Sequence, residues 1–177
     1  MPESRYDVSA LVSVYNCERF IAGCLDDLER QTIADRLEIV VINSGSTQGE
    51  EAIIREYQRR HANIVYLRTE TRESIYAAWN RGISVARGRY LTNANSDDRH
   101  RRDALEVLAR ALDAQPAVDM VYANSLISRV ENEPFEQCAA APAGRIRHIA
   151  AADRAAYFLH GGGGHQPMWR KRVHDTF

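Results

Sequence analysis

The sequence predicts an α/β protein of three layers, in which helices cover both faces of a mostly parallel β-sheet. Two observations lead to this prediction. Short apolar runs alternate with longer segments of helical periodicity between residues 9 and 125. The run at 37–42, LEIVVI, is apolar at every position except Glu38, which is typical of a strand that is covered on both faces. Strands that alternate with helices are joined by right-handed crossovers, so their carboxyl ends share one edge of the sheet.

The elements follow in order from these patterns. Residues 9–14 (SALVSV) predict the first strand. The next segment predicts a helix, because its apolar side chains fall on one helical face: Phe20, Ile21, Cys24, Leu25 and Leu28. The remaining strands are predicted at 37–42, 63–67, 89–93 and 118–125, and the remaining helices at 49–60, 74–88 and 103–113. Gly88 is predicted to end the third helix. Beyond Asn124 the pattern weakens.

Composition limits the classes of function. Of the 177 residues, 45% are hydrophobic and 27% are charged, which is ordinary for a globular domain, and we expect one domain over residues 1–177. The net charge of -1 argues against a nucleic-acid partner. No apolar run approaches the roughly 20 residues of a transmembrane segment, and the N-terminus has no signal-peptide character. The three cysteines form no even disulfide framework, which predicts reduced thiols in a cytoplasmic protein.

Polar side chains gather where three predicted strands end. Tyr15 and Asn16 follow the first strand, residues 43–46 (NSGS) follow the second, and residues 93–98 (NANSDD) follow the fourth. In sheets of this kind, ligands bind beyond the carboxyl ends of the strands. The three clusters therefore predict one binding crevice.

Each polar cluster allows two interpretations. The adjacent carboxylates Asp97 and Asp98 either form a solvated turn that caps the next helix, or bind a divalent cation whose other ligands come from a diphosphate. The basic run at 99–102 is either a solvated helix start or a phosphate-binding patch. Asn43 either makes an Asx turn or hydrogen-bonds a planar base through its amide. Tyr15 either stacks on that base or is a half-buried aromatic side chain.

The segments VSVYNCERFIAGCLDDLERQT, EIVVINSGSTQGE and ESIYAAWNRGISVARGRYLTNANSDD, in this order, resemble family 2 inverting glycosyltransferases of the GT-A fold. The resemblance extends from about Val8 to Phe177. It implies a nucleotide-diphospho-sugar donor held across the strand ends and a divalent metal, Mn²⁺ or Mg²⁺. It also implies an acceptor hydroxyl on a glycan, a lipid-linked molecule or another compound.

The resemblance further implies roles for particular residues. In the family, the tyrosine after the first strand lies near the base, and the helix that carries IYAAWNRGI binds near the diphosphate and ribose. The Asp-x-Asp signature falls on Asn95 and Asp97, so Asp97 and the following Asp98 are the implied metal ligands. His165 and Gln166 are candidates for the acceptor side. The implied donor-binding residues are Tyr15, Asn16, Glu18, Asn43, Ser44, Tyr76, Asn80, Asn95 and Ser96.

Three departures from the family pattern matter. Asn43 and Asn95 are amides where carboxylates are common, so metal binding depends mainly on Asp97. Trp79 stands where many members carry arginine, and core packing is the suggested role of this ring. The general base of the family lies beyond a Gly-x-Phe-Asp-Glu segment, and the sequence given ends at Phe177, before such a segment. We therefore assign no base, and expect the C-terminal portion of the domain to be missing.

The resulting hypothesis is a metal-assisted glycosyltransferase of polysaccharide biosynthesis that inverts the donor sugar. We expect it in the cytoplasm or at the inner face of the membrane. The alternative is a nucleotide-sugar-binding domain without catalysis, which would also lack the base. A nucleotidyltransferase is disfavoured because YNCERF is not a glycine-rich phosphate loop, and a dehydrogenase because G-x-G-x-x-G is absent.

Overall fold

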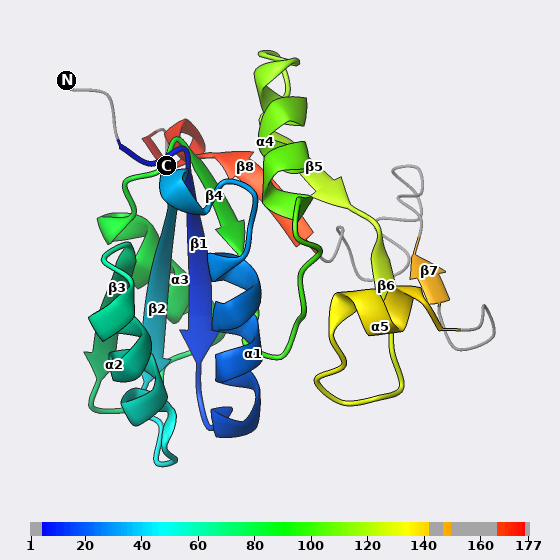
Figure 1. Ribbon diagram of the computed structural model, residues 1–177. Helices are drawn as coiled ribbons and strands as arrows, with labels where there is room; N and C mark the ends of the chain where they lie inside the picture. The colour runs from blue at the N-terminus through cyan, green and yellow to red at the C-terminus, as the bar shows by residue number, and fades with distance from the viewer. Residues whose placement is uncertain (1–4, 142–146, 150–165, 176–177) are drawn as a thin grey trace.

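The computed structural model describes residues 5–141, 147–149 and 166–175. It has a six-stranded sheet of order β3-β2-β1-β4-β8-β5, with helices on both faces (Figure 1). The expectation of a three-layer α/β fold is therefore confirmed. The strands of this sheet are β1 (Val8–Val14), β2 (Leu37–Ser44), β3 (Ile64–Thr69), β4 (Tyr90–Asn93), β5 (Met120–Ala123) and β8 (Gln166–Arg170). The helices are α1 (Glu18–Glu29), α2 (Glu50–Arg60), α3 (Ile75–Val85), α4 (Ala104–Asp113) and α5 (Phe135–Ala139), with 3₁₀ turns η1 (Ala34–Arg36) and η3 (Lys171–Asp175).

The parallel part of the sheet consists of β3, β2, β1 and β4. In register, Val14 of β1 lies opposite Asn43 of β2, and Leu11 lies opposite Asn93 of β4. β8 runs antiparallel to both β4 and β5, so a late segment of the chain joins two earlier strands. The segments that follow β1, β2 and β4 consequently leave the sheet side by side, as the polar clusters predicted.

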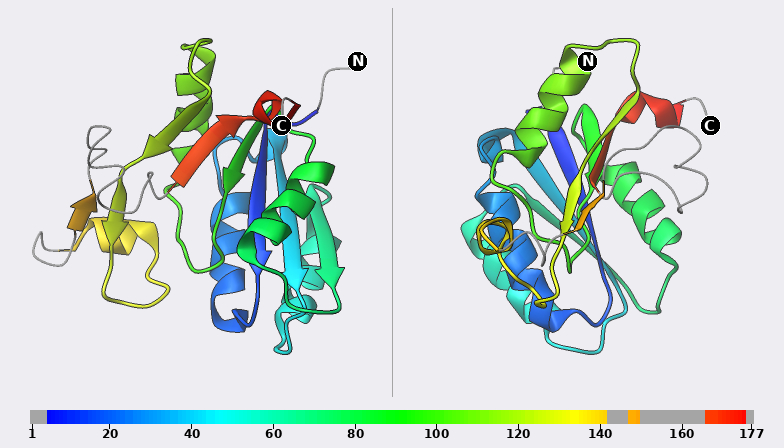
Figure 2. Two further views of the ribbon diagram at one scale, coloured as in Figure 1. Left: turned by 180° about the vertical axis from the view of Figure 1, so that it is seen from behind. Right: turned by 90° about the vertical axis from the view of Figure 1, so that its right-hand side faces the viewer.

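Side-chain alternation along the central strands divides the buried apolar residues into two clusters. Val8 and Val12 of β1 belong to the cluster beneath α1, α2 and α4, whereas Leu11 belongs to the cluster beneath α3. Figure 2 shows α3 on the face of the sheet opposite to α1 and α2. Gly82 lets α3 approach closely, because a Cβ atom there would lie 2.8 Å from Cδ1 of Ile42.

The prediction that Gly88 ends the third helix is wrong. α3 ends at Val85, and Ala86 is already extended. Gly88 instead lies against β1, where a Cβ atom would come within 2.5 Å of the Ser9 nitrogen. The Gly88 N–H donates a hydrogen bond of 2.8 Å to Ser9 Oγ. Gly88 therefore allows the chain to pack closely against β1, and it does not end a helix.

The predicted strand at 118–125 is divided into two elements. β5 ends at Ala123, and β6 (Ser125–Ile127) pairs with β7 (Arg147–Ile149) in a separate antiparallel sheet. A turn and the short helix α5 follow β6, in the region beyond Asn124 where the sequence pattern weakens. The described residues contain no helix long and apolar enough to cross a membrane.

Candidate functional site

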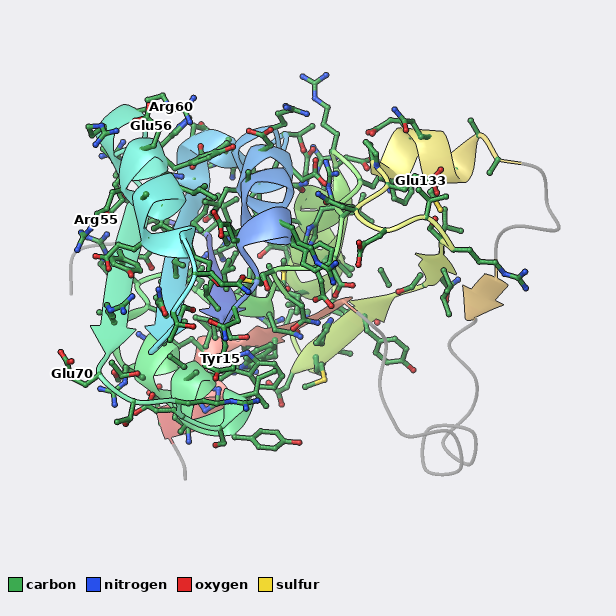
Figure 3. All side chains as sticks on the ribbon, turned by 90° about the horizontal axis from the view of Figure 1, so that it is seen from below. Tyr15, Arg55, Glu56, Arg60, Glu70 and Glu133 are labelled. Carbon is green, nitrogen blue, oxygen red and sulfur yellow. The ribbon has the colours of Figure 1, made fainter. Side chains whose placement is uncertain are left out.

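The site lies at the carboxyl edge of the parallel strands, which faces the viewer in Figure 3. Tyr15 follows β1, and its side chain is 38% exposed. The guanidinium carbon of Arg72, from the segment between β3 and α3, lies 4.2 Å from the centre of the Tyr15 ring. This cation–π contact places a positive charge on the face that a planar base would use.

Asn16 connects the first strand end to the second. Its φ of 50° is left-handed, a conformation that asparagine tolerates better than most residues. Its N–H donates to Ser46 Oγ at 3.1 Å, and its Oδ1 accepts from the Thr47 N–H at 2.9 Å. Glu18 makes a similar link, since its Oε2 accepts from the Gly49 N–H at 3.1 Å. Both predicted donor-binding side chains therefore hold the loop after β2 in place.

Asn43 and Ser44 are buried at the end of β2. The Asn43 Oδ1 accepts from the N–H of Ser46, three residues on, at 2.9 Å, and its Nδ2 donates to the Tyr66 hydroxyl at 3.0 Å. Gly45, between Asn43 and Ser46, has φ of 68°, a value that favours glycine. Of the two interpretations of Asn43, the local turn is the one that the hydrogen bonds support.

Cys17 lies where the three strand ends meet. Burial raises the pKa of its thiol above the usual value, the Ser96 hydroxyl lowers it, and the Glu50 and Asp97 carboxylates raise it further. The Cys17 N–H also donates to Glu50 Oε1 at the start of α2. The pKa of this buried thiol therefore depends on groups from the segments after β1, β2 and β4. These predicted site segments lie close together.

The carboxylates Asp97 and Asp98 are both exposed beyond β4. Asp98 Oδ2 accepts from Asn95 Nδ2 at 2.9 Å, and the Asp98 N–H donates to the Asn95 carbonyl at 3.1 Å. Within the described ranges, no group of three or more His, Cys, Asp or Glu side chains could hold a metal ion. Two exposed carboxylates suit a hard cation that takes its remaining oxygens from a diphosphate and water. The residues present therefore fit a cation that is coordinated both by these carboxylates and by the diphosphate of a bound ligand.

The basic run after these carboxylates has mixed environments, and its last two arginines are exposed just before α4 begins at Ala104. Arg99 forms a two-pronged ion pair with Asp27 of α1, with contacts of 2.7 and 2.9 Å. His100 is buried. Arg101 pairs with Asp103 at 2.5 Å in an exposed position. The sequence predicted the charges but not their division between a buried and an exposed ion pair.

The predicted residues on α3 are partly separated from this convergence. Tyr76 is 70% exposed, and its ring contacts the Trp79 ring edge-on at 5.8 Å between centroids. Asn80 is also exposed. Trp79 packs against the apolar cluster under α3, which confirms the core-packing expectation for this side chain. The segment before α3 reaches the site through Arg72 and not through these side chains.

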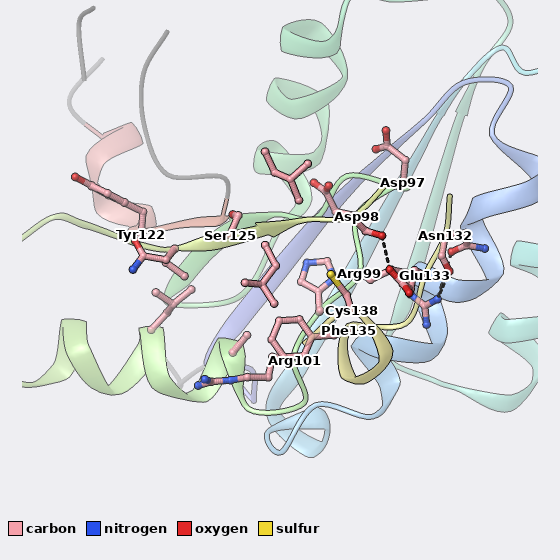
Figure 4. Close-up of a pocket in the computed structure, with 18 of the residues that line it drawn as sticks. Asp97, Asp98, Arg99, Arg101, Tyr122, Ser125, Asn132, Glu133, Phe135 and Cys138 are labelled. Carbon is pink, nitrogen blue, oxygen red and sulfur yellow. Dashed lines mark hydrogen bonds between the residues drawn. The ribbon is translucent and has the colours of Figure 1, made fainter. Parts of the chain in front are cut away.

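A cleft of about 890 Å³ adjoins the carboxylates, and Asp97 and Asp98 lie on its rim (Figure 4). Its walls come from α4, the β5–β6 segment and α5, and are largely apolar. Tyr122, Ser125 and Glu133 add polar groups to the lining. A cavity of this size and composition suits an organic ligand with both apolar and polar parts.

The candidates for the acceptor side are only partly described. His165 lies outside the described residues. Gln166 begins β8 and is paired with Ala123 of β5. Its backbone therefore lies near the β5 wall of the cleft, since Ala123 is one of the lining residues.

Sequence reasoning missed three residues that shape the site: Cys17, Glu50 and Arg72. The signal for Glu50 was a carboxylate in the first turn of a predicted helix, where an acidic side chain can bond backbone N–H groups. No comparable signal existed for Arg72, because its contact with Tyr15 joins residues that are distant in the sequence.

The fold and the site define a GT-A protein, and comparison with known proteins agrees. The sequence model described as glycosyl transferase family 2 matches residues 9–176. The chain therefore belongs to glycosyl transferase family 2. EpsH of Bacillus subtilis (strain 168), a protein named as a glycosyltransferase, is 35% identical over 117 residues, which are 66% of this chain and 33% of EpsH.

Two solved structures are similar as well. The mannosyltransferase PcManGT of Pyrobaculum calidifontis, in complex with GDP-Man and Mn²⁺, has a TM-score of 0.62 and 26% identity, over 71% of this chain and 36% of that one. Residues 1–349 of S. aureus TarS have a TM-score of 0.72 over 96% of this chain and 48% of that fragment, and at 20% identity this likeness concerns the fold. The chain spans about a third to a half of these proteins.

Proposed function

We propose that this protein transfers a glycosyl group from a nucleotide-diphospho-sugar to an acceptor hydroxyl, with inversion at the anomeric carbon. The single observation that carries the proposal is that the segments after β1, β2 and β4 lie side by side, joined by hydrogen bonds and strand pairing, in a chain of glycosyl transferase family 2. The structure of PcManGT with GDP-Man and Mn²⁺ supports a donor of this class.

The donor would lie across the ends of β1, β2 and β4. Tyr15 offers a ring and Arg72 a guanidinium to the base and ribose. Asn16, Glu18 and Asn43 act by keeping the two adjoining loops rigid, as their hydrogen bonds indicate, and Ser44 is the buried last residue of β2. A preorganised loop lowers the ordering cost when the ligand binds. The side chains of Tyr76, Asn80 and Asn95 stay in the proposal as the outer boundary of the donor site, and Ser96 as a buried residue beside Cys17.

Asp97 and Asp98 would hold a divalent cation, Mn²⁺ or Mg²⁺, together with the diphosphate. Such an ion supplies a Lewis acid for the negative charge of the leaving diphosphate. Within the described residues, the Asn95 amide would orient the Asp98 carboxylate through its hydrogen bond, while the Asp97 carboxylate is exposed. We assign the role of general base to none of the described residues.

The acceptor would enter the cleft between α4, β6 and α5, because Asp97 and Asp98 form the border between this cleft and the donor crevice. An acceptor on a glycan, a lipid-linked molecule or another hydroxyl compound is consistent with its mixed lining. A cytoplasmic location is supported by the free state of Cys17, Cys24 and Cys138. A position at the inner face of the membrane would follow from a lipid-linked acceptor.

The decisive experiment compares Asp97→Ala with Asp35→Ala, an exposed aspartate of η1 outside the site. A form of the protein extended beyond Phe177, to include the segment where the family carries its general base, is assayed with UDP-, GDP- and dTDP-sugars, with and without Mn²⁺. We expect metal-dependent turnover that falls about 100-fold in Asp97→Ala and is unchanged in Asp35→Ala. Donor binding without turnover in the unaltered protein would favour the non-catalytic alternative, and equal turnover in both variants would refute the metal role of Asp97.

A further inference from the structure

Arg99, directly after the two carboxylates, is fixed on one side by α1. Its Nε lies 2.7 Å from Asp27 Oδ2, and its Nη2 lies 2.9 Å from Asp27 Oδ1. The two side chains are only 14% and 10% exposed. Asp27 Oδ2 also accepts from the His100 N–H at 2.9 Å. One carboxylate therefore holds the side chain of Arg99 and the backbone of the next residue.

Arg99 is fixed on its other side by the wall of the cleft. Its Nη1 donates to the Asn132 carbonyl at 3.0 Å and to Asn132 Oδ1 at 3.3 Å. Asn132 in turn donates from Nδ2 to the Arg19 carbonyl at 3.1 Å. Gly23 leaves room for this arrangement, because a Cβ atom there would lie 2.8 Å from Asn132 Oδ1 and 3.2 Å from Arg99 Cζ.

The segment from Asn95 to His100 is also held at its other end. Its contacts there include the Asn95–Asp98 hydrogen bonds, a hydrogen bond of 3.6 Å from Cys24 Sγ to the Asn95 carbonyl, and the Ser96 hydroxyl against the Cys17 thiol. The Asp27–Arg99 pair fixes the residue directly after Asp98, so it contributes to the direction in which Asp97 and Asp98 point. A fork of two parallel N–H···O bonds fixes orientation as well as position, which a lysine could not do.

We propose that Asp27 and Arg99 are positioning residues, which aim the Asp97–Asp98 carboxylates at the cation and join them to the cleft wall through Asn132. This inference rests on the proposed function, since it requires a cation at Asp97. Residues that orient the ligands of a metal change its affinity when they are altered, although they never touch it. A purely structural ion pair would change stability and leave the affinity for metal intact.

The test measures Mn²⁺ binding by electron paramagnetic resonance, in the presence of UDP or GDP, for Asp27→Asn, Arg99→Lys and Arg101→Ala. Arg101 is the matched control, because its ion pair with Asp103 is on the same segment but is exposed. We expect Mn²⁺ to bind about tenfold more weakly to Asp27→Asn and to Arg99→Lys, and unchanged to Arg101→Ala. The double variant Asp27→Asn/Arg99→Gln should resemble the single variants, because the two residues act as one unit.

The outcomes separate this inference from the proposed function. If the unaltered protein binds no Mn²⁺ with either nucleotide, the proposed metal site fails. If it binds Mn²⁺ and the two positioning variants bind equally well, the inference is overturned while the proposed function stands. Arg99→Lys retains the positive charge, so it provides the comparison even if Asp27→Asn folds poorly. A variant with a lowered melting temperature and unchanged Mn²⁺ affinity would mark the pair as structural only.

Discussion

The four basic residues that follow Asp98 have different environments, although they are adjacent in the sequence. Arg99 is buried against Asp27, His100 is buried, Arg101 is in an exposed ion pair and Arg102 is exposed. The buried pair combines charge with two directed hydrogen bonds in a setting of low dielectric. The exposed pair is screened by water and contributes little. At the scale of single residues, burial therefore decides which charge has a structural effect.

The cysteines give a prediction at this scale. Burial raises the pKa of the Cys17 and Cys24 thiols, so both remain protonated at pH 8. Since the thiolate is the reactive form, we expect the native protein to resist alkylation at pH 8 and the unfolded protein to react at all three cysteines. Because the folded-state pKa is the higher one, the free energy of unfolding should decrease as the pH rises above the ordinary thiol pKa.

Mass spectrometry after iodoacetamide treatment measures the labelling, site by site. Cys138, which is also buried but lies on α5 in the wall of the cleft, is the internal comparison for a buried thiol that is not at the strand ends. Rapid labelling of Cys17 in the native protein at pH 7 would contradict the prediction, since it would require an accessible thiolate between the strand ends.

The helices on the two faces of the sheet differ in how much they bury. α1 buries Ile21, Cys24, Leu25, Asp27 and Leu28, whereas α3 buries Ala78 and Gly82. A long apolar stripe anchors a helix through the hydrophobic area that it covers. Small residues instead allow the helix backbone to approach the strands. At the scale of elements, α1 is therefore the stronger anchor, and it is also the helix that carries Asp27.

Two isoleucines provide a matched test of this difference. Ile21 in α1 is fully buried, and Ile75 in α3 is 45% exposed. We expect Ile21→Ala to lower the free energy of unfolding by about 2–5 kcal/mol, and Ile75→Ala to lower it by under about 1 kcal/mol. Chemical denaturation of both variants measures the difference. Similar losses in the two would show that α3 contributes more packing than its exposure indicates.

At the scale of the whole molecule, a strand from the last described part of the chain, β8, joins two strands that come much earlier in the sequence. β8 pairs with β4 and with β5, and Arg170 at its end extends the connection to α4. Its Nη2 donates to the Leu112 carbonyl at 2.7 Å, and its Nε donates to the Val118 carbonyl at 2.9 Å. These bonds satisfy carbonyls at and after the end of α4, which otherwise lack partners within the helix.

Arg170 and Arg172 form a second matched pair of variants. Arg170→Ala removes charged hydrogen bonds from a partly buried position, and we expect it to lower the free energy of unfolding by about 3 kcal/mol. Arg172→Ala removes an exposed ion pair with Asp119, which should cost under about 1 kcal/mol. Thermal unfolding monitored by circular dichroism distinguishes the two. Equal shifts in the melting temperature would argue against Arg170 as the connection between β8 and α4.

The sequence by itself determined the layered α/β fold, the order of strands and helices along the chain, and the edge at which the polar ends of the strands meet. Periodicity and apolar runs carry this information locally, because a strand or a helix repeats its pattern over a few residues. The sequence also indicated Asp97 and Asp98, since adjacent carboxylates after an apolar strand are unusual.

Only the tertiary structure decided what the individual polar groups do. Asn43 holds the Ser46 N–H, Glu18 holds the Gly49 N–H, and Asp27 orients Arg99 from 72 positions away. These roles depend on which side chains the packed elements bring within hydrogen-bond distance. No local sequence pattern specifies such a distance. A carboxylate in a helix gives the same sequence pattern whether its side chain faces water or a guanidinium in the interior.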